Sequence, residues 1–546
     1  MRLTAVQSIL LTLGLTLSAA GQAHRLDAID PTEESEFPGG RGRDQLILYT
    51  PEYGQLNTGT NELGSEAVVI DGLVANFGGN DSEIPSDGFI LSGNGSALRW
   101  MVRNLAPGTP VAHDENSVWI DHSITGQLAS ARWRLADAER RLAEFPESAE
   151  ESAEIESLRA AIAQITDPMP AMTQRLASLE AVAFDRELAA LPSPAEEVHA
   201  VWHRLDTASP EAIAAEVEAM AQAHVNALFT EVNFGSSVVY PDPTGLFPQV
   251  ERFQGSDPLE ILIEECHARG IEVHAWVHNF FLGYIHSEYS VPQRFGDEHP
   301  EWVSVNRRGE SVLMPWGYMY LNPAHLGLHD ALIEAHTAMM EAYDLDGYHY
   351  DHIRFCLSLS WESGWDYSDH TRGRVREELG FDPMEISPDE NGEEWAQWID
   401  WRQAQVTRYV ERQSEAIRRV RPDALISAAV FPDLEAAIEN KGQNWGAWVE
   451  SGHLNAPMPM IYTPSVDEVR GAVQELVSHM PGGSPAVIGL GPYLGFSPRL
   501  LVDQIVAARE AGATGECLFV WHRLDPADQS ALASGPWRWS GSPSWE

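Results

Sequence analysis

The chain has 546 residues, of which 44% are hydrophobic and 21% are charged, a composition that supports large folded cores and excludes disordered, collagen-like and multi-span membrane proteins. Its 81 acidic and 35 basic residues give a formal net charge of -46, so its electric field repels nucleic acids and anionic membrane surfaces. We therefore expect no nucleic-acid partner, and at about 100 to 200 residues per domain the length predicts two or three domains.

Residues 1–23 have the three parts of a secretory signal peptide. Arg2 precedes an apolar run from Ile9 to Leu17, and small residues that suit cleavage after Ala20 or Ala23 follow it. The run is shorter than the roughly 20 apolar residues of a membrane-spanning helix, and an uncleaved anchor is the alternative interpretation. We expect a secreted or periplasmic protein that has no membrane span once the peptide is removed.

Residues 24–121 predict a small β-rich module. Short apolar runs alternate with turn residues, in the order LILYT, AVVIDGLVANFG, IPSDGFILSG and VWI, and one short helix is expected near 97–104. The segment contains no recognisable catalytic spacing. We interpret it as a packing or carbohydrate-binding module.

Residues 122–192 predict a helical hairpin or a short coiled coil. The segment is rich in Ala, Leu, Glu and Arg, its apolar residues recur at helical spacing, and Pro146, Pro168 and Pro170 interrupt it. Its alternating charges are typical of a solvated helix face.

Residues 193–532 predict a (β/α)8 TIM barrel, an α/β fold, with residues 533–546 as a C-terminal tail. Eight apolar runs suited to buried parallel strands alternate with helical segments. A doubly wound open sheet is the alternative, but no GxGxxG or GxxxxGK[ST] motif follows any of the runs. The runs are VHAVWH, NALFTEV, IEVHAWV, GYHYDHI, ALISAAV, APMPMIY, AVIGLG and ECLFVWH.

Polar and aromatic residues stand at the ends of these predicted strands, where (β/α)8 barrels carry their active sites. Period-two alternation places Glu231 and Asn233 on one face of strand 2, and it does the same for alternate residues of strands 3 and 4. The candidates are Glu231 and Asn233 on strand 2, His274, Trp276, His278 and Asn279 on strand 3, His349, Asp351, His352 and Arg354 on strand 4, Asp433 after strand 5, Tyr462 on strand 6, and Trp521 and His522 on strand 8.

This set contains the groups that glycosidic cleavage needs. One carboxylate attacks the sugar or activates water, another protonates the leaving oxygen, and aromatic rings offer flat faces to the sugar. Asp351 closes an apolar strand, where an acid rarely serves packing. Glu231 and Asp433 are rival partners, because either residue can instead cap a helix or orient a neighbour.

The region from Glu197 to Leu524 resembles the family-10 glycosylhydrolase-like proteins, which are secreted or periplasmic bacterial (β/α)8 barrels. The resemblance rests on NALFTEVNFGSSVVYPD, DPLEILIEECHARGIEVHAWVHNF, YLNPAHLGLHDALIEAHTAMMEAYDLDGYHYDHIRF, WAQWIDWRQ and NWGAWVESGHLNAPMPMIYT. The family is similar to the enzyme that cleaves denuded peptidoglycan glycan strands. Its DG, Asp and Arg pattern falls on Asp346, Gly347, Asp351 and Arg354, and the resemblance implies that Asp351 is the nucleophile.

The chain departs from the family pattern at three positions. His278, followed by Asn279, stands where the family usually has Asn, and Asn455 stands where an acid usually precedes the PMxY segment. Glu231 occupies a position that is often Gln in relatives, which weakens its claim to be the general acid. The resemblance therefore leaves Glu231 and Asp433 as rivals.

Three functions fit this sequence. The first is a retaining glycoside hydrolase that acts on a carbohydrate and needs no cofactor. The second is a metal-dependent hydrolase or deacetylase, although His274 and His278 would stand about 13 Å apart on one strand. The third is a non-catalytic sugar-binding protein. The sequence does not indicate the oligomeric state. The histidines and the acid considered for zinc are His274, His278, His349, Asp351 and His522.

Overall fold

The computed structural model describes most of the chain. The predicted signal segment 1–23 lies outside the described residues, and within them no helix is long and apolar enough to cross a membrane. The described residues are 26–28, 44–60, 64–114, 117–146, 148–164, 169–194, 196–285, 296, 298–313, 317–356, 361–481, 484–539 and 541–545.

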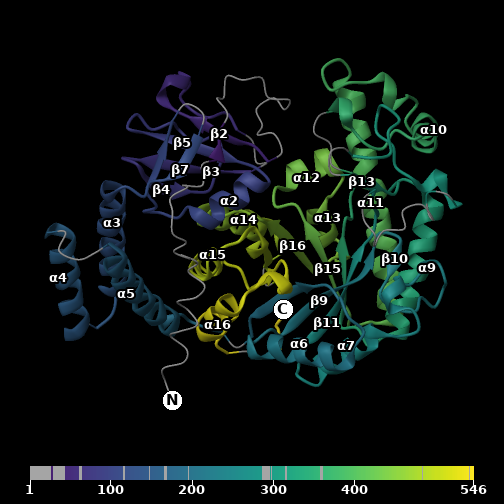
Figure 1. Cartoon of the computed structure of the whole chain (residues 1–546). Helices are drawn as coiled ribbons and strands as arrows, with labels where there is room; N and C mark the ends of the chain where they lie inside the picture. The colour runs from purple at the N-terminus through teal and green to yellow at the C-terminus, as the bar shows by residue number, and fades with distance from the viewer. Residues whose placement is uncertain are drawn as a thin grey trace.

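Eight parallel strands close into a barrel (Figure 1). The last strand pairs with the first and the first with the second, so no edge remains open. This closure confirms the predicted (β/α)8 barrel over a doubly wound sheet. In order around the barrel the strands are β8 (Val198–His203), β9 (Ala227–Phe234), β11 (Glu272–His278), β14 (Gly347–Asp351), β15 (Leu425–Val430), β16 (Ala456–Ile461), β17 (Val487–Leu490) and β18 (Gly515–Leu518).

Helices cover the outside of the barrel. Several begin at a Ser or Asp cap followed by Pro, as at Ser209, Asp257 and Ser497, whose side chains accept backbone N–H groups of the first turn. The helices are α6 (Pro210–Gln222), α7 (Pro258–His267), α9 (Leu326–Ala342), α10 (Asp369–Glu378), α11 (Gly392–Val420), α12 (Leu434–Lys441), α13 (Trp445–Glu450), α14 (Val466–His479), α15 (Pro498–Glu510) and α16 (Pro526–Ser534).

Two apolar cores result from the alternation along the strands. The outer core lies between strands and helices, and a separate inner core fills the barrel with Trp202, Phe229, Trp276 and Met458. Burying each of these side chains contributes roughly 1.5 to 3 kcal/mol to folding. Side chains therefore fill the interior of the barrel, so a functional site can lie only at one of its two ends.

The N-terminal module has a four-stranded sheet, a three-stranded sheet and one helix, α2 (Ser96–Asn104), close to the range predicted. Leu98 and Val102 of α2 pack against Leu494 and Phe496, which follow strand β17. The module thus lies against the end of the barrel where its strands finish. Its strands are β1 (Leu26–Asp27), β2 (Leu46–Tyr49), β3 (Ser65–Ile70), β4 (Leu73–Phe77), β5 (Gly88–Gly93), β6 (Val111–His113) and β7 (Ser117–Ile120).

The helical segment is a three-helix unit, where the sequence predicted a hairpin. Its helices are α3 (Ile124–Leu142), α4 (Ala149–Gln164) and α5 (Met169–Ala190), and they share a core of their own. The extra helix arises because a break near Pro146 separates α3 from α4. Figure 1 shows the unit beside the barrel, and Glu187 of α5 joins it to Arg499 of α15 at 2.6 Å.

Short elements complete the two ends of the barrel. At the end of the barrel where its strands finish, β10 (Ser237–Val238) turns back to pair antiparallel with the end of β9, and β12 (Phe281–Tyr284) pairs with β13 (Tyr318–Tyr320). At the opposite end, Trp545 in the C-terminal tail lies against Phe229 and His274. Its indole N–H donates to Glu272 Oε2 at 2.9 Å.

Candidate active site

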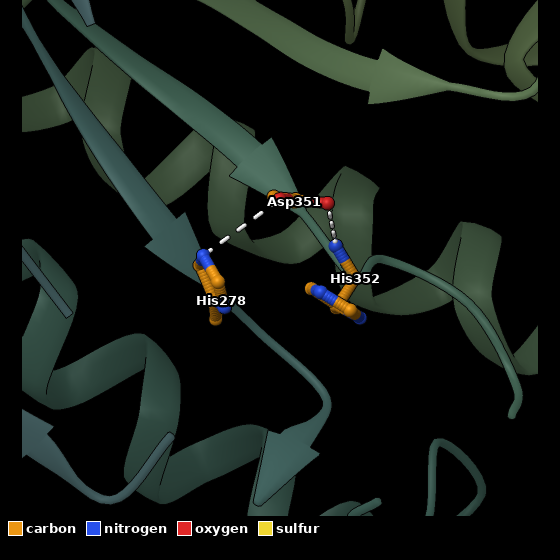
Figure 2. A group of neighbouring side chains, drawn as sticks. All are labelled: His278, Asp351 and His352. Carbon is orange, nitrogen blue, oxygen red and sulfur yellow. Dashed lines mark hydrogen bonds and ion pairs between the residues drawn. The ribbon is translucent and has the colours of Figure 1, made fainter. Parts of the chain in front are cut away.

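Two carboxylates and one imidazole meet at the ends of three adjacent strands. His278, at the end of β11, places Nε2 3.2 Å from Glu231 Oε1 on β9 and 3.7 Å from Asp351 Oδ2 on β14. Figure 2 shows the His278 and Asp351 side chains projecting toward each other from neighbouring strands. Since one nitrogen contacts both acids, these two carboxylate oxygens are at most about 7 Å apart, which is compatible with the roughly 5 to 5.5 Å between the carboxyl groups of retaining glycosidases.

The carboxylate of Asp351 is held by two donors. The indole N–H of Trp276 donates to Oδ2 at 3.0 Å, and the backbone N–H of His352 donates to Oδ1 at 2.6 Å. Burial favours the neutral acid, but the charge of Arg354, the nearby ring of His278 and the hydrogen bond from Trp276 outweigh it and hold the pKa of Asp351 well below its usual range. Asp351 is therefore an oriented anion at neutral pH.

Glu231 is also ionised. The guanidinium Nε–H of Arg204, which follows strand β8, donates to Glu231 Oε1 at 3.1 Å. Burial raises the pKa of Glu231, yet the contacts with His278 and Arg204 lower it more, so that it lies below the ordinary glutamate value. Neither carboxylate of the site thus keeps a proton at neutral pH.

His352 is a neutral acceptor beside this pair. Arg354 lies 3.3 Å from its Nδ1 and Tyr320 Oη lies 2.9 Å from the same atom. Arginine can only donate, so Nδ1 must be the unprotonated nitrogen. Burial lowers the pKa of His352 well below its usual value, in agreement with this tautomer. Arg354 therefore keeps its charge close to Asp351 without an ion pair among the described residues.

Aromatic rings surround the polar groups. Phe234 and Phe281 lie 5.1 and 5.7 Å from the ring of His278, centroid to centroid. On the other side, Phe519 lies 6.0 Å from Trp276 and 5.5 Å from Tyr462. Rings of this kind supply apolar faces on which pyranose rings stack, while the acids and arginines supply hydrogen bonds. The site thus combines carboxylates, arginines and flat aromatic faces, the kinds of group that carbohydrate-binding sites use.

A model of the family Glycosyl hydrolase-like 10 matches residues 197–483, more than half of the chain. The chain belongs to this family. This membership confirms the resemblance noted in the sequence, and it makes the barrel a glycoside hydrolase-like domain.

Individual relatives are distant. Glycosyl hydrolase YngK from Bacillus subtilis is 21% identical over 263 residues, which are 44% of this chain and 46% of that protein. Glycosyl hydrolase DigH from Escherichia coli K12 is 21% identical over 41% of this chain and 53% of its own length. The match thus spans about half the length of each relative. Among solved structures, the PgaB (BpsB) glycoside hydrolase domain from Bordetella bronchiseptica is 12% identical, covers 63% of this chain and 99% of its own, and gives a TM-score of 0.48.

Two predicted residues of the glycosyl hydrolase-like barrel hold its strands together. His349 Nε2 accepts the indole N–H of Trp202 at 3.2 Å, and its Nδ1 contacts Ser427 Oγ at 2.8 Å. Burial lowers the pKa of His349 to about 3, so it is a neutral imidazole inside the barrel. Asn279 donates to the backbone oxygens of Val277 and Asp351, which joins the ends of β11 and β14.

Asn233 does not follow Glu231 inward as alternation predicted. A bulge shifts the register, so that Glu231 lies beside Trp276 but Asn233 lies beside Val277, a residue of the outer core. One extra residue reverses the facing of all that follow in a strand. Both side-chain polar atoms of Asn233 are buried without a hydrogen-bond partner among the described residues.

Three more candidates lie away from the paired acids. Strand β18 ends at Leu518, so Trp521 and His522 fall in a short 3-10 helix instead of on the strand. Trp521 packs in the outer core, and His522 is exposed. Asp433 is exposed and accepts the N–H of Ala436 at 2.8 Å as the N-cap of α12. This cap is the alternative role that the sequence left open for Asp433.

The histidines considered for zinc are separated by the fold. His274 lies at the opposite end of the barrel, 3.2 Å from Glu272. Both ring nitrogens of His349 already have hydrogen-bond partners, Trp202 and Ser427. Among the described residues, ligand atoms of His278, Asp351 and His352 lie within 4.8 Å of one another. They fit a cation poorly, because Arg354 already donates to His352 and its charge opposes a metal ion. We assign no metal to this group.

Sequence reasoning missed Arg204, Phe519 and Tyr320. Arg204 follows the first predicted strand directly, and its place after a strand end was the available signal. Phe519 was read as part of the eighth strand although it follows that strand's end. Tyr320 comes from a hairpin between strands 3 and 4, and nothing in a single sequence shows how such an insertion folds back.

Proposed function

We propose that this protein is a glycoside hydrolase that cleaves O-glycosidic bonds of a poly- or oligosaccharide with a carboxylate pair, in which Asp351 is the nucleophile and Glu231 its partner. The observation that carries the proposal is the approach of both ionised carboxylates to one imidazole, inside a ring of aromatic side chains. Asp351 is buried, oriented by two hydrogen bonds and charged, as attack on an anomeric carbon requires.

The proposed substrate is a bacterial cell-wall glycan, and the proposed location is outside the cytoplasm. The resemblance to a family that is similar to the enzyme cleaving denuded peptidoglycan glycan strands supports the substrate, and the leader-like residues 1–23 support export. Retention of anomeric configuration is proposed because an oriented, ionised aspartate suits covalent attack.

The test is the release of new reducing ends. The full chain is incubated with peptidoglycan glycan strands stripped of stem peptides, with chitooligosaccharides and with plant and algal polysaccharides. We expect hydrolysis of at least one glycan, unchanged by EDTA and absent in Asp351→Asn, with the first product in the substrate's anomeric form by NMR. Binding without any reducing-end release would contradict the proposal and favour a non-catalytic sugar-binding protein.

A further inference from the structure

Both acids of the site are ionised, so the proton for the leaving group needs another source. Glycosidic oxygen departs as a poor anion unless it is protonated as its bond breaks. Asp351 receives two hydrogen bonds and lies near His352, His278 and Arg354, and Glu231 is paired with Arg204. Each of these contacts stabilises the carboxylate form.

His278 is the side chain that lies between the two carboxylates. We propose that His278 is the proton donor to the departing glycosidic oxygen and that Glu231 is the residue that positions and charges its imidazole. The inference rests on the proposed hydrolase function and adds a catalytic residue to it. The Nε2 atom of His278 lies between Glu231 and Asp351, and its side chain is 3% exposed.

The hydrogen bonding of His278, His349 and His352 separates the roles of these three histidines. His349 has partners on both ring nitrogens, and His352 accepts from Tyr320 and Arg354. Both nitrogens of His278 are buried; Nδ1 has no hydrogen-bond partner among the described residues, and Nε2 faces the carboxylates of Glu231 and Asp351 at 3.2 and 3.7 Å. The ring of His278 is therefore turned toward the two carboxylates and is not held by the structural hydrogen bonds that fix His349 and His352.

The charged neighbours of His278 come from every adjacent element. Glu231 on β9 and Asp351 on β14 favour the imidazolium. Arg204, beyond Glu231, and Arg354, beyond His352, oppose it from farther away. The two nearest charges are therefore negative, and at contacts of 3 to 4 Å they outweigh more distant charges.

The proposed reaction has two steps, in which an ester bond to Asp351 forms and is then hydrolysed. A carboxylate oxygen of Asp351 bonds to the anomeric carbon, the bond from that carbon to the glycosidic oxygen breaks with its electron pair on oxygen, and the Nε2 proton of His278 moves to that oxygen. The neutral imidazole then takes a proton from water as the water oxygen bonds to the anomeric carbon. The ester bond to Asp351 breaks, its electron pair returns to the carboxylate, and the imidazolium is restored.

A titration tests the pairing without any substrate. Histidine-selective NMR of the full chain, with the His278 signal assigned through His278→Gln, follows the ring's protonation. We expect Glu231→Gln to lower the midpoint of the His278 signal by roughly one pH unit, a tenfold loss of proton affinity, because it removes the nearest anion. An unchanged midpoint would overturn the pairing of Glu231 with His278.

Leaving-group dependence tests the catalytic role. Phenyl and 2,4-dinitrophenyl glycosides are made from the oligosaccharide that the wild-type protein releases in the reducing-end assay. We expect His278→Gln to lose roughly 10²- to 10³-fold in kcat/KM on the phenyl glycoside and less than about tenfold on the dinitrophenyl glycoside, whose leaving group needs no proton. His349→Gln, which removes another buried histidine of the barrel, should lose the same factor on both.

The outcomes separate the two proposals. Equal losses for His278→Gln on both glycosides overturn the role of His278 and leave the hydrolase function in place. Failure of the wild-type protein to cleave any glycan overturns the hydrolase function itself, while the titration still reports whether Glu231 charges the ring.

Discussion

Strand β11 carries a histidine beside a glutamate at each of its ends. At one end His274 lies 3.2 Å from Glu272, and at the other His278 lies 3.2 Å from Glu231. The first pair is covered by Trp545, whose indole N–H occupies Glu272. The second pair has a further carboxylate, Asp351, within 3.7 Å. The neighbours of a His–Glu pair therefore decide its role. The His274–Glu272 pair packs under a tryptophan, whereas the His278–Glu231 pair faces a further carboxylate and is a candidate catalytic group.

The largest expected effect is the loss of activity in Asp351→Asn. The amide keeps the shape of the carboxylate but cannot attack an anomeric carbon, so we expect reducing-end release to fall by about 10³-fold or more. The matched control is Glu272→Gln, a carboxamide at the opposite end of the barrel, which should keep nearly all activity. Retention of more than about a tenth of the rate by Asp351→Asn would remove strand β14 from the catalytic centre.

A smaller loss is expected for Glu231→Gln. Removing the anion that positions and charges His278 should reduce kcat/KM by about 10²-fold, the lower end of the roughly 10² to 10⁴ that a general acid such as the proposed His278 contributes. Asp433→Asn should change the rate by less than about threefold and leave helix α12 intact, because Asn caps as well as Asp. If Asp433→Asn lost more than Glu231→Gln in the same assay, the rival would be the partner acid.

Asp366, a second buried aspartate, lies in the segment between β14 and β15 and shows what burial does to the pKa of an aspartate. Asp366 is fully buried and accepts from the Ser368 N–H at 2.9 Å, with no ion pair among the described residues. Burial raises the pKa of Asp366 to about 6, whereas the cations around Asp351 lower its pKa.

A raised pKa means that the folded state holds the proton more tightly than the unfolded chain. Stability from Asp366 is therefore present below about pH 4 and is lost as pH rises to about 6, by roughly 2 to 3 kcal/mol. Urea unfolding across this range should show a slope in the wild type that Asp366→Asn removes. The same slope in both proteins would assign it to other groups.

The smallest effect on rate is expected for a substitution of Trp545, which covers the end of the barrel opposite Asp351. Trp545→Ala removes contacts with Phe229 and His274 and the hydrogen bond to Glu272, and should lower the free energy of unfolding by about 1 to 3 kcal/mol. The rate at 25 °C should change by less than about threefold. Trp539→Ala, a change of a 63% exposed side chain in the same tail, should alter neither. A large rate loss in Trp545→Ala alone would mean that the two ends are coupled.

The barrel was predictable from the sequence because each strand is a short, nearly continuous apolar run. The position of Asp351 and His278 at the ends of such runs also indicated that both are site residues, and each is the last residue of its strand. Strict alternation misplaced Asn233, because a bulge of one residue leaves no mark in a single sequence. The eighth strand was extended too far because LFVWH remains apolar after the chain leaves the sheet. Tyr320 depended on tertiary folding of an insertion, which no local pattern encodes.

The position of Trp545 also bears on when the barrel can be completed during synthesis. Glu272, which its indole binds, lies 273 residues earlier in the chain, and the pairing of β18 with β8 likewise joins the last strand to the first. A ribosome must therefore deliver almost the whole barrel before either closure can form, and contacts of such long sequence separation form slowly. Until then β8 has an unpaired edge, and we expect the nascent chain to depend on partners that cover it.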